Sequence, residues 1–426
     1  MKKFLLSLTS LCCALMCAAQ TDSLARHLTL SAQNWARGEV RVGALPAENG
    51  DDYAMFLMGN TVMRLDYTTP WLDVRFAPRY YGVWGSSSNG KLDVDEAWFT
   101  LKSKHGFAAR LGRQKLSYDD QRIIGNDDWA MASFTHDALK MSYEGGRHKV
   151  HLLMAFNQND ENLNGGTYYT GGGQPYKSMQ TLWYHYDPWP WLGASLIGMN
   201  TGMQSLKENE NKTLYQQIAG GFLDFHPRNF SLQASYYRQM GYDENALPIH
   251  AWMTSVESVW KATGNLSLLT GYFHMSGDPC FFVPPEGAFG MARKTEVCGF
   301  NPIFGSHHKF YGAMDFFYVT TYYGGNTPGL QDFHIGTKWS PWPRFTLQGM
   351  YHFLATSVAI ENAGKALGHE LEASLSWQLA TDVNLQAGYT FMHGTNTMSV
   401  LKRSGSGNRL HWGWLMLRVT PEFFHL

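Results

Sequence analysis

Charged residues are scarce in this sequence, making up only 16% of its 426 residues, whereas soluble domains usually carry about 25%. The formal net charge is -1, so neither a nucleic acid nor a strongly anionic surface is indicated as a partner. After Met16, no segment approaches the roughly 18 uncharged apolar residues that a membrane-spanning helix requires. The sequence therefore excludes a helical membrane protein, and the scarcity of charge indicates that something other than water covers much of the surface.

Cysteine is also rare. Three of the five cysteines lie in the first 17 residues, which leaves Cys280 and Cys298 on either side of a loop rich in proline and glycine. In an oxidising compartment these two could form a disulfide worth about 3 kcal/mol, and two free thiols are an equally good interpretation. A metal site that combines them with His307 and His308 fits no usual zinc spacing. We therefore expect no metal site and no cofactor.

The N-terminus has the pattern of a secretory signal peptide. Lysines follow Met1, an apolar run extends from Phe4 to Met16, and small side chains stand at Ala18 and Ala19. This order of a charged, an apolar and a small-residue region predicts cleavage after Ala19. We expect residues 1–19 to be the signal peptide and residues 20–426 to form a single domain.

Alternation of apolar and polar residues dominates the remaining sequence. In "LEASLSWQL" (Leu371–Leu379) every second residue is apolar, and "VNLQAGYTF" (Val383–Phe391) repeats the pattern, which is the period of a β-strand with two different faces. Similar segments recur along the chain, separated alternately by short turns and long polar segments. Tryptophan and proline at the turn edges "DPWPW" and "SPWPR" are typical of an aromatic girdle at a membrane interface. The sequence predicts an all-β transmembrane antiparallel barrel of about eighteen strands, with short periplasmic turns and long extracellular loops, in the outer membrane of a Gram-negative cell.

The barrel prediction assigns charged side chains to faces. A charge on the lipid face near the middle of the membrane costs about 2 to 4 kcal/mol, so charges that alternate with apolar residues should face the lumen. In "WLDVRFAPRYY", for example, Leu72, Val74 and Phe76 occupy the lipid face. The residues predicted to line the pore on this basis are Arg64, Arg75, Arg79 and Arg110, with Glu96 beside them. A second interpretation is that these charges only neutralise one another within a wet pore.

The stretch "LGRQKLSYDDQRIIGNDDW" (Leu111–Trp129) begins as a strand and leaves it near Leu116. Its second part is a loop rich in acidic and basic residues, and loops that fold back into a pore form its constriction. A solvated surface network is the alternative. The long segment Ser276–Gly329 is expected to be another extracellular loop, and the sequence leaves open whether it folds inward. The residues predicted for the constriction are Arg113, Asp119, Asp120, Gln121 and Arg122.

Several segments together resemble the alginate-export family of outer-membrane barrels. The first runs from "DEAWFTLKSKHGFAARLGRQKLSYDDQRIIGNDDW" into "FTHDALKM", and it is followed by "FNPIFGSHHKFYGAMDFF" (Phe300–Phe317), "GLQDFHIG" and "LGHELEASL" with "NLQAGYTF". These segments span roughly residues 93 to 393. The resemblance implies an eighteen-stranded monomeric barrel, with arginines and folded-in loops in its lumen, that passes an anionic uronate polymer.

We expect a porin for passive diffusion of hydrophilic solutes, anionic or oligosaccharide in character, rather than a dedicated alginate exporter or an enzyme. The expected partners are outer-membrane lipid, the barrel-assembly machinery and these solutes, with no nucleic acid. One alternative is a hydrolase within the barrel, either a lipase that uses His274 and Ser276 of "HMSGD" or a protease that uses His307, His308 and Asp315. A surface receptor without transport is another alternative.

Overall fold

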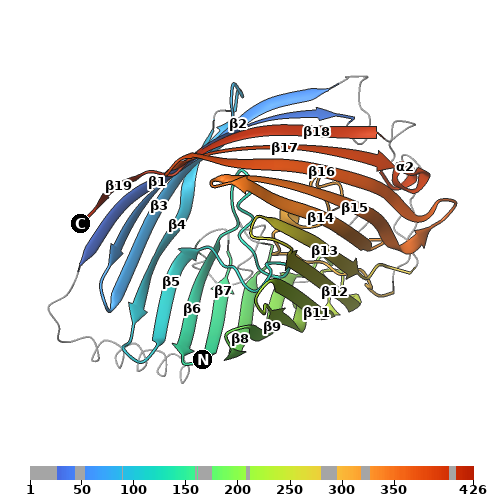
Figure 1. The fold of residues 1–426 in the computed structure, drawn as a ribbon. Helices are drawn as coiled ribbons and strands as arrows, with labels where there is room; N and C mark the ends of the chain where they lie inside the picture. The colour runs from blue at the N-terminus through green and yellow to red at the C-terminus, as the bar shows by residue number, and fades with distance from the viewer. Residues whose placement is uncertain are drawn as a thin grey trace.

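The computed structural model describes residues 26–43, 53–88, 90–158, 161, 175–207, 212–279, 295–317, 327–402 and 409–426. The predicted signal peptide and Cys280, one partner of the disulfide considered above, lie outside these ranges. Within the described residues almost all regular structure is antiparallel strand (Figure 1). No helix in this part of the chain is long and apolar enough to cross a membrane.

The strands are β1 (His27–Val42), β2 (Ala54–Thr68), β3 (Leu72–Val83), β4 (Lys91–Lys102), β5 (Phe107–Gln114), β6 (His136–Gly145), β7 (His148–Phe156), β8 (Ser178–Trp189), β9 (Leu192–Gln204), β10 (Thr213–Phe225), β11 (Phe230–Tyr242), β12 (Pro248–Lys261), β13 (Leu266–Met275), β14 (Leu330–Trp342), β15 (Phe345–Ile360), β16 (Gly364–Ala380), β17 (Val383–Gly394), β18 (Arg409–Val419) and β19 (Glu422–His425). A 3-10 turn, η1 (His307–Lys309), and a short helix, α2 (Asn396–Lys402), lie in loops.

The sheet closes on itself through β1, which pairs with β2 on one side and with β18 on the other. Asn34 of β1 lies opposite Val419 of β18, and Thr29 lies opposite His425 of β19. β19 thus continues the line of β18 after an interruption at Pro421, which has no backbone N–H to donate to the ladder. The described residues therefore form a closed barrel of eighteen strands, as predicted, and closure leaves no unpaired strand edge facing lipid.

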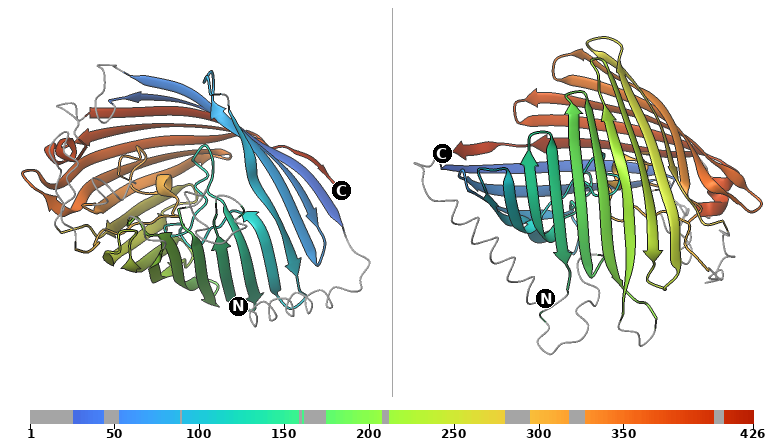
Figure 2. Two further views of the ribbon diagram at one scale, coloured as in Figure 1. Left: turned by 180° about the vertical axis from the view of Figure 1, so that it is seen from behind. Right: turned by 90° about the horizontal axis from the view of Figure 1, so that it is seen from below.

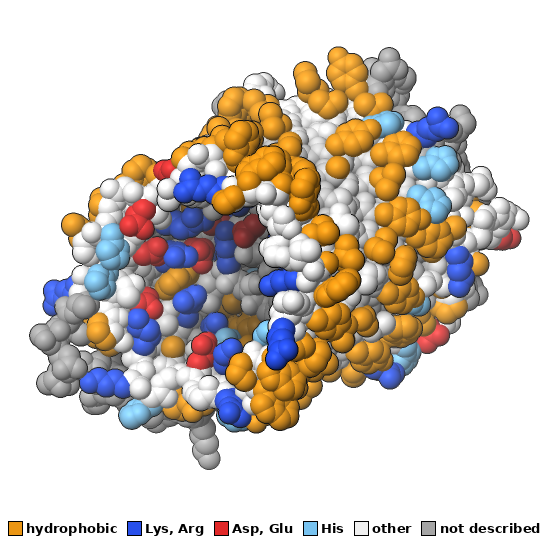
Figure 3. Space-filling view, viewed as in Figure 1, with side chains coloured by type: hydrophobic (Ala, Val, Ile, Leu, Met, Phe, Trp, Pro, Cys, Tyr) orange, Lys and Arg blue, Asp and Glu red, His pale blue; other side chains and the backbone are white. Residues whose placement is uncertain are grey.

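The two faces of each strand differ as the alternation predicts. On β18, Leu415 and Leu417 are 56% and 42% exposed, whereas Met416 between them is 2% exposed. The exposed apolar side chains cover the outer wall, and the end of the barrel near β19 is hollowed and lined by side chains of both charges (Figure 3). This arrangement suits a cylinder with lipid outside and polar groups inside.

Two loops fold into the barrel and meet there (Figures 1 and 2). They are the β5–β6 connection, residues 115–135, and the described part of the β13–β14 connection, chiefly residues 295–317. Ile124 and Phe304 form a parallel bridge, the Gly125 amide donates to the Phe304 carbonyl at 2.7 Å, and the Ser306 amide donates to the Gln121 carbonyl at 3.0 Å. Ile124 and Phe304 are buried within the apolar core that the loops form against the inner wall.

Candidate functional site

The first part of the candidate site is the inner wall of β2 to β5, which carries the predicted arginines. Leu65, Phe76 and Leu111 on these strands are 42%, 50% and 48% exposed on the outer face. Their chain neighbours Arg64, Arg75 and Arg110 therefore point to the lumen, because successive strand residues face opposite sides.

Two of the wall arginines are neutralised by carboxylates. Arg75 donates to Asp66 at 2.6 Å and to Glu96 at 3.0 Å. Arg79 reaches two carboxylates of β4, Asp93 at 2.8 Å and Asp95 at 2.7 Å. For Arg75 and Arg79, the interpretation as a neutralising network fits the geometry.

Two other wall arginines are placed differently. Arg64 donates to the amide oxygen of Gln33 at 3.2 Å, while Arg110 donates through Nε to the Thr100 hydroxyl at 2.8 Å and stacks 3.7 Å above the Trp98 ring. Within the described ranges neither arginine forms an ion pair with a carboxylate. Their guanidinium groups therefore supply positive charge to the lumen, and both terminal amino groups of Arg110 stay available to a solute.

Arg110 borders a cavity of about 300 Å³ near the short-turn end of the barrel. Lys140 lies directly opposite Arg110 in the ladder between β5 and β6, and Lys102, Asp73 and Glu144 also line the cavity. Because Lys102 is paired with Asp73 at 2.5 Å, Arg110 and Lys140 provide most of the positive charge that a solute meets there.

The structure does not bring Arg113 to the constriction where the sequence analysis placed it. The ladder on both sides of β5 runs through Gly112 without a shift in register, so alternation puts Arg113 on the outer face together with Leu111. There it pairs with Asp137 at 2.8 Å, and both side chains are exposed, Arg113 to 40% and Asp137 to 55%.

Arg122 is the central residue of the inward β5–β6 loop. Its side chain is 2% exposed, and it contacts Asp120 of the same loop at 3.1 Å and Glu257 of β12 at 2.5 Å. Its guanidinium carbon also lies 3.8 Å from the centre of the Phe310 ring in the second loop. Arg122 therefore ties one loop to the barrel wall and to the other loop.

The two predicted aspartates of this loop are also inside the barrel. Asp119 accepts a hydrogen bond from Trp183 Nε1 at 3.1 Å, and the backbone carbonyl of Asp120 accepts one from Lys309 Nζ at 3.1 Å. Burial raises the pKa of both carboxyl groups above the ordinary value, and burial lowers the pKa of Lys309. The loop charges are thus parts of a packed interior network rather than a solvated surface.

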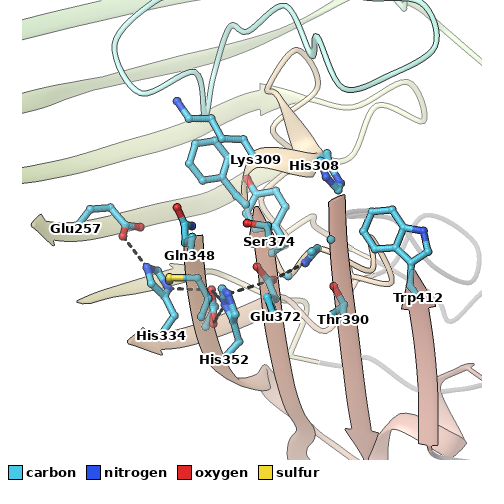
Figure 4. Close-up of a pocket in the computed structure, with 18 of the residues that line it drawn as sticks. Glu257, His308, Lys309, His334, Gln348, His352, Glu372, Ser374, Thr390 and Trp412 are labelled. Atoms are coloured by element: carbon cyan, nitrogen blue, oxygen red, sulfur yellow. Dashed lines mark hydrogen bonds and ion pairs between the residues drawn. The ribbon is translucent and has the colours of Figure 1, made fainter. Parts of the chain in front are cut away.

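A second cavity, of about 370 Å³, lies between the loops and the inner wall (Figure 4). Charged groups of both signs line it. The carboxylates are those of Asp120, Glu257, Asp332 and Glu372, the cations are Arg122 and Lys309, and the histidines are His308, His334 and His352. Both ring nitrogens of His334 and His352 face carboxylates, so these histidines add to the two cations and the lining of this cavity is mixed in charge.

The sequence analysis missed His334 and His352, although the pattern held a signal. In "GLQDFHIG" and "GMYHF" each histidine alternates with exposed apolar residues such as Phe333 and Phe353. Face assignment alone would have placed both histidines in the lumen. Their closeness to each other, however, depends on the pairing of β14 with β15, in which His334 lies opposite His352.

The residues of the hydrolase alternatives are distributed as follows. His274 stacks on Trp252 at 4.6 Å, while the Ser276 hydroxyl donates to the Cys298 carbonyl at 2.7 Å and accepts from the Trp252 amide at 2.9 Å. This serine therefore spans two backbone groups in a structural role. His308 does meet Asp315, with Nδ1 2.8 Å from the nearer carboxylate oxygen.

Comparisons with known proteins agree with the barrel. The model of the alginate-export family matches residues 72–164, which confirms the resemblance for that part of the chain. No curated protein shows significant sequence similarity. Among solved structures, OccAB1 of Acinetobacter baumannii has 12% identity and a TM-score of 0.62 over 93% of this chain and 97% of its own. OccK2 (OpdF) of Pseudomonas aeruginosa, solved with glucuronate, has 11% identity and a TM-score of 0.62 over 93% and 98%.

A third similar structure, OpdK of Pseudomonas aeruginosa with vanillate, has 9% identity and a TM-score of 0.59 over 93% of this chain and 99% of its own. At these identities the likeness concerns the fold. The chain thus has the closed eighteen-stranded barrel of outer-membrane porins, and this fold indicates the outer membrane as its location.

Proposed function

We propose that this protein is a monomeric outer-membrane channel through which small hydrophilic solutes bearing a carboxylate, including acidic sugars and short oligosaccharides, diffuse down their gradients. The observation that carries the proposal is the pair of lumen-facing guanidinium groups, Arg64 and Arg110, that have no carboxylate partner among the described residues. Its partners would be the surrounding lipid and the barrel-assembly machinery.

The chemistry of this wall suits carboxylates. A guanidinium binds a carboxylate through two parallel N–H···O bonds, and Arg110 keeps both terminal amino groups for that purpose because Nε alone is used by Thr100. Stacking on Trp98 holds the guanidinium plane in place. In a water-filled lumen such contacts are weak enough for release, as conduction requires.

The size of the cavities favours small solutes over a long polyanion. Two inward loops meet in the lumen beside a cavity of about 370 Å³, which suits a small solute better than a long chain of uronates. OccK2 and OpdK were solved with glucuronate and vanillate, each a single small carboxylate. We extend that class of solute to this chain, while the likeness to the alginate-export family supports sugar acids as members of it.

The test is ion selectivity in a planar bilayer. The refolded barrel is placed in a salt gradient, and the reversal potential is measured for the wild type and for the Arg64→Ala/Arg110→Ala double variant. The matched control is Arg238→Ala, since Arg238 is exposed on the outer face of β11. We expect anion preference in the wild type and the control, and a shift toward cation preference in the double variant.

Carboxylate recognition is tested in the same bilayers by adding glucuronate and counting the transient reductions in current. We expect fewer and shorter events in the double variant, because the guanidinium donors are gone. A wild-type barrel that inserts but does not conduct, or a double variant with unchanged selectivity, contradicts the proposal.

A further inference from the structure

The inner wall of β12 to β16 carries a row of residues that pair directly across the strands. Glu257 lies opposite Gly271, Gly271 opposite His334, His334 opposite His352, and His352 opposite Glu370. All of these positions face the lumen, and directly opposed side chains on one face lie about 5 Å apart at Cβ. The barrel thus brings two imidazoles and two carboxylates from four strands into one line, with Gly271 of β13 between Glu257 and His334.

Asp332 completes a cluster with the two histidines, because it lies two residues before His334 on the same face of β14. Its carboxylate is 3.0 Å from Nδ1 of His334 and 3.0 Å from Nδ1 of His352. Each of the three residues offers one ligand atom, and these three atoms all lie within 4.8 Å of one another. A tetrahedral zinc ion places its ligand atoms about 3.4 Å apart, so only small movements separate this arrangement from coordination.

The other nitrogen of each ring is also held by a carboxylate. His334 Nε2 is 2.6 Å from Glu257, and His352 Nε2 is 3.3 Å from Glu372. Histidines that bind a metal through one nitrogen usually donate the other N–H to a carboxylate, which orients the ring. With Nδ1 of both rings turned to Asp332 and Nε2 turned to glutamates, a metal ion can take the place of the Nδ1 protons.

Gly271 makes one of these contacts possible. It stands between Glu257 and His334 in the row, and a Cβ added there would overlap both the glutamate oxygen and His334 Nε2. The absence of a side chain at this position therefore lets the glutamate of β12 reach across β13 to the histidine of β14.

The surroundings favour a divalent cation. Asp332, His334 and His352 are 3%, 9% and 8% exposed, and they border the cavity of about 370 Å³, so a metal could enter while most bulk water is excluded. Glu257, Asp332 and Glu372 bring three negative charges to the cluster, and Arg122 returns one positive charge through its contact with Glu257. Two nitrogen ligands and one oxygen ligand select zinc and its neighbours over magnesium and calcium, which prefer oxygen ligands.

We propose that Asp332, His334 and His352 form a binding site for a divalent transition metal of the zinc class on the lumen wall, oriented by Glu257 and Glu372. The coordination position that faces the cavity is left to water or to a carboxylate of a solute. The site does not depend on the proposed channel function, because a barrel that does not conduct could bind the metal equally well.

Zinc binding is measured by titration calorimetry on the refolded full barrel, purified without a polyhistidine tag and stripped with a chelator. We expect one zinc ion per barrel, with binding reduced at least about 100-fold in His334→Ala/His352→Ala. The control variant is His369→Ala/His411→Ala, because these histidines bond to Tyr351 and Tyr389 on the outside of the barrel, and its binding should match the wild type.

Two further variants separate coordination from folding. Asp332→Asn keeps the side-chain shape but removes the anionic ligand. Glu257→Gln keeps a hydrogen-bond acceptor but weakens the orientation of His334, and we expect this variant to bind zinc about 10- to 100-fold more weakly. Circular dichroism and heat-dependent gel migration report folding for each variant. Absence of stoichiometric zinc binding in the wild type, or an equal loss in the outer-histidine control, overturns the proposal, and the cluster is then an ion-pair network held by protons alone.

Discussion

Replacing Arg122 by alanine should release the inward β5–β6 loop from the wall. The change removes the contacts with Asp120 at 3.1 Å and Glu257 at 2.5 Å and the stacking on Phe310. Leaving a buried charge without its partner costs about 3 to 5 kcal/mol. Glu257 keeps His334 at 2.6 Å, and Asp120 keeps a backbone amide at 3.1 Å, so we expect the lower end, about 3 kcal/mol.

Hydrogen exchange measures this loss of loop stability. The amides of Tyr118 and Gly125, which donate to Ile124 and Phe304, exchange when the loop opens, and a loss of about 3 kcal/mol corresponds to exchange faster by about 100-fold. The control is Arg113→Ala, whose ion pair lies exposed on the outer face and should change loop exchange less than about fivefold.

A double-mutant cycle with Glu257→Ala isolates the contact across to β12. We expect a coupling energy of about 2 kcal/mol between Arg122 and Glu257, since directly contacting buried partners couple by about 0.5 to 3 kcal/mol. The opened loop should also raise single-channel conductance in Arg122→Ala. The reasoning is refuted if loop exchange in Arg122→Ala equals that of Arg113→Ala, because the buried contacts would then contribute no more than an exposed pair.

Two more predictions concern single side chains. Burial lowers the pKa of Lys402 in α2 to about 8, so the folded state binds fewer protons than the unfolded state between about pH 8 and pH 10.5. Over that range the unfolding free energy of the wild type should rise relative to Lys402→Met by about 3 kcal/mol, and a constant difference in urea titrations would contradict this. Gly112→Ala should cost about 3 kcal/mol, since φ is +128° and a Cβ would overlap the Ala97 carbonyl. Gly198→Ala, which has open space around it, should be nearly neutral, and equal melting temperatures for the two variants would refute the clash.

The face of each side chain could be predicted from the sequence because alternation is a local property. A residue on a strand faces the lumen or the lipid according to its position in a two-residue period, which correctly placed Val74 and Phe76 on the lipid face, where they are 37% and 50% exposed. The number of strands followed in the same way from counting alternating segments and turns. The fold class needed no information about which strands meet.

Arg113 shows where local reasoning reached its limit. From the sequence, Arg113 stood near the end of a strand, where a role at the constriction was compatible with the pattern. The partner strands decide against this role, because β4 and β6 pair with β5 in a continuous register through Gly112. Arg113 accordingly faces outward and pairs with Asp137.

The sequence by itself thus determined an eighteen-stranded barrel and an inner wall bearing Arg64 and Arg110, because hydrophobic burial acts on each strand separately. Only the tertiary structure decided which distant residues touch. Ile124 meets Phe304 because two loops fold into the same lumen, and His334 meets His352 because β14 and β15 pair in one register. Register and loop packing depend on closure of the whole barrel, so the cluster around Asp332 has no counterpart in any single segment of the chain.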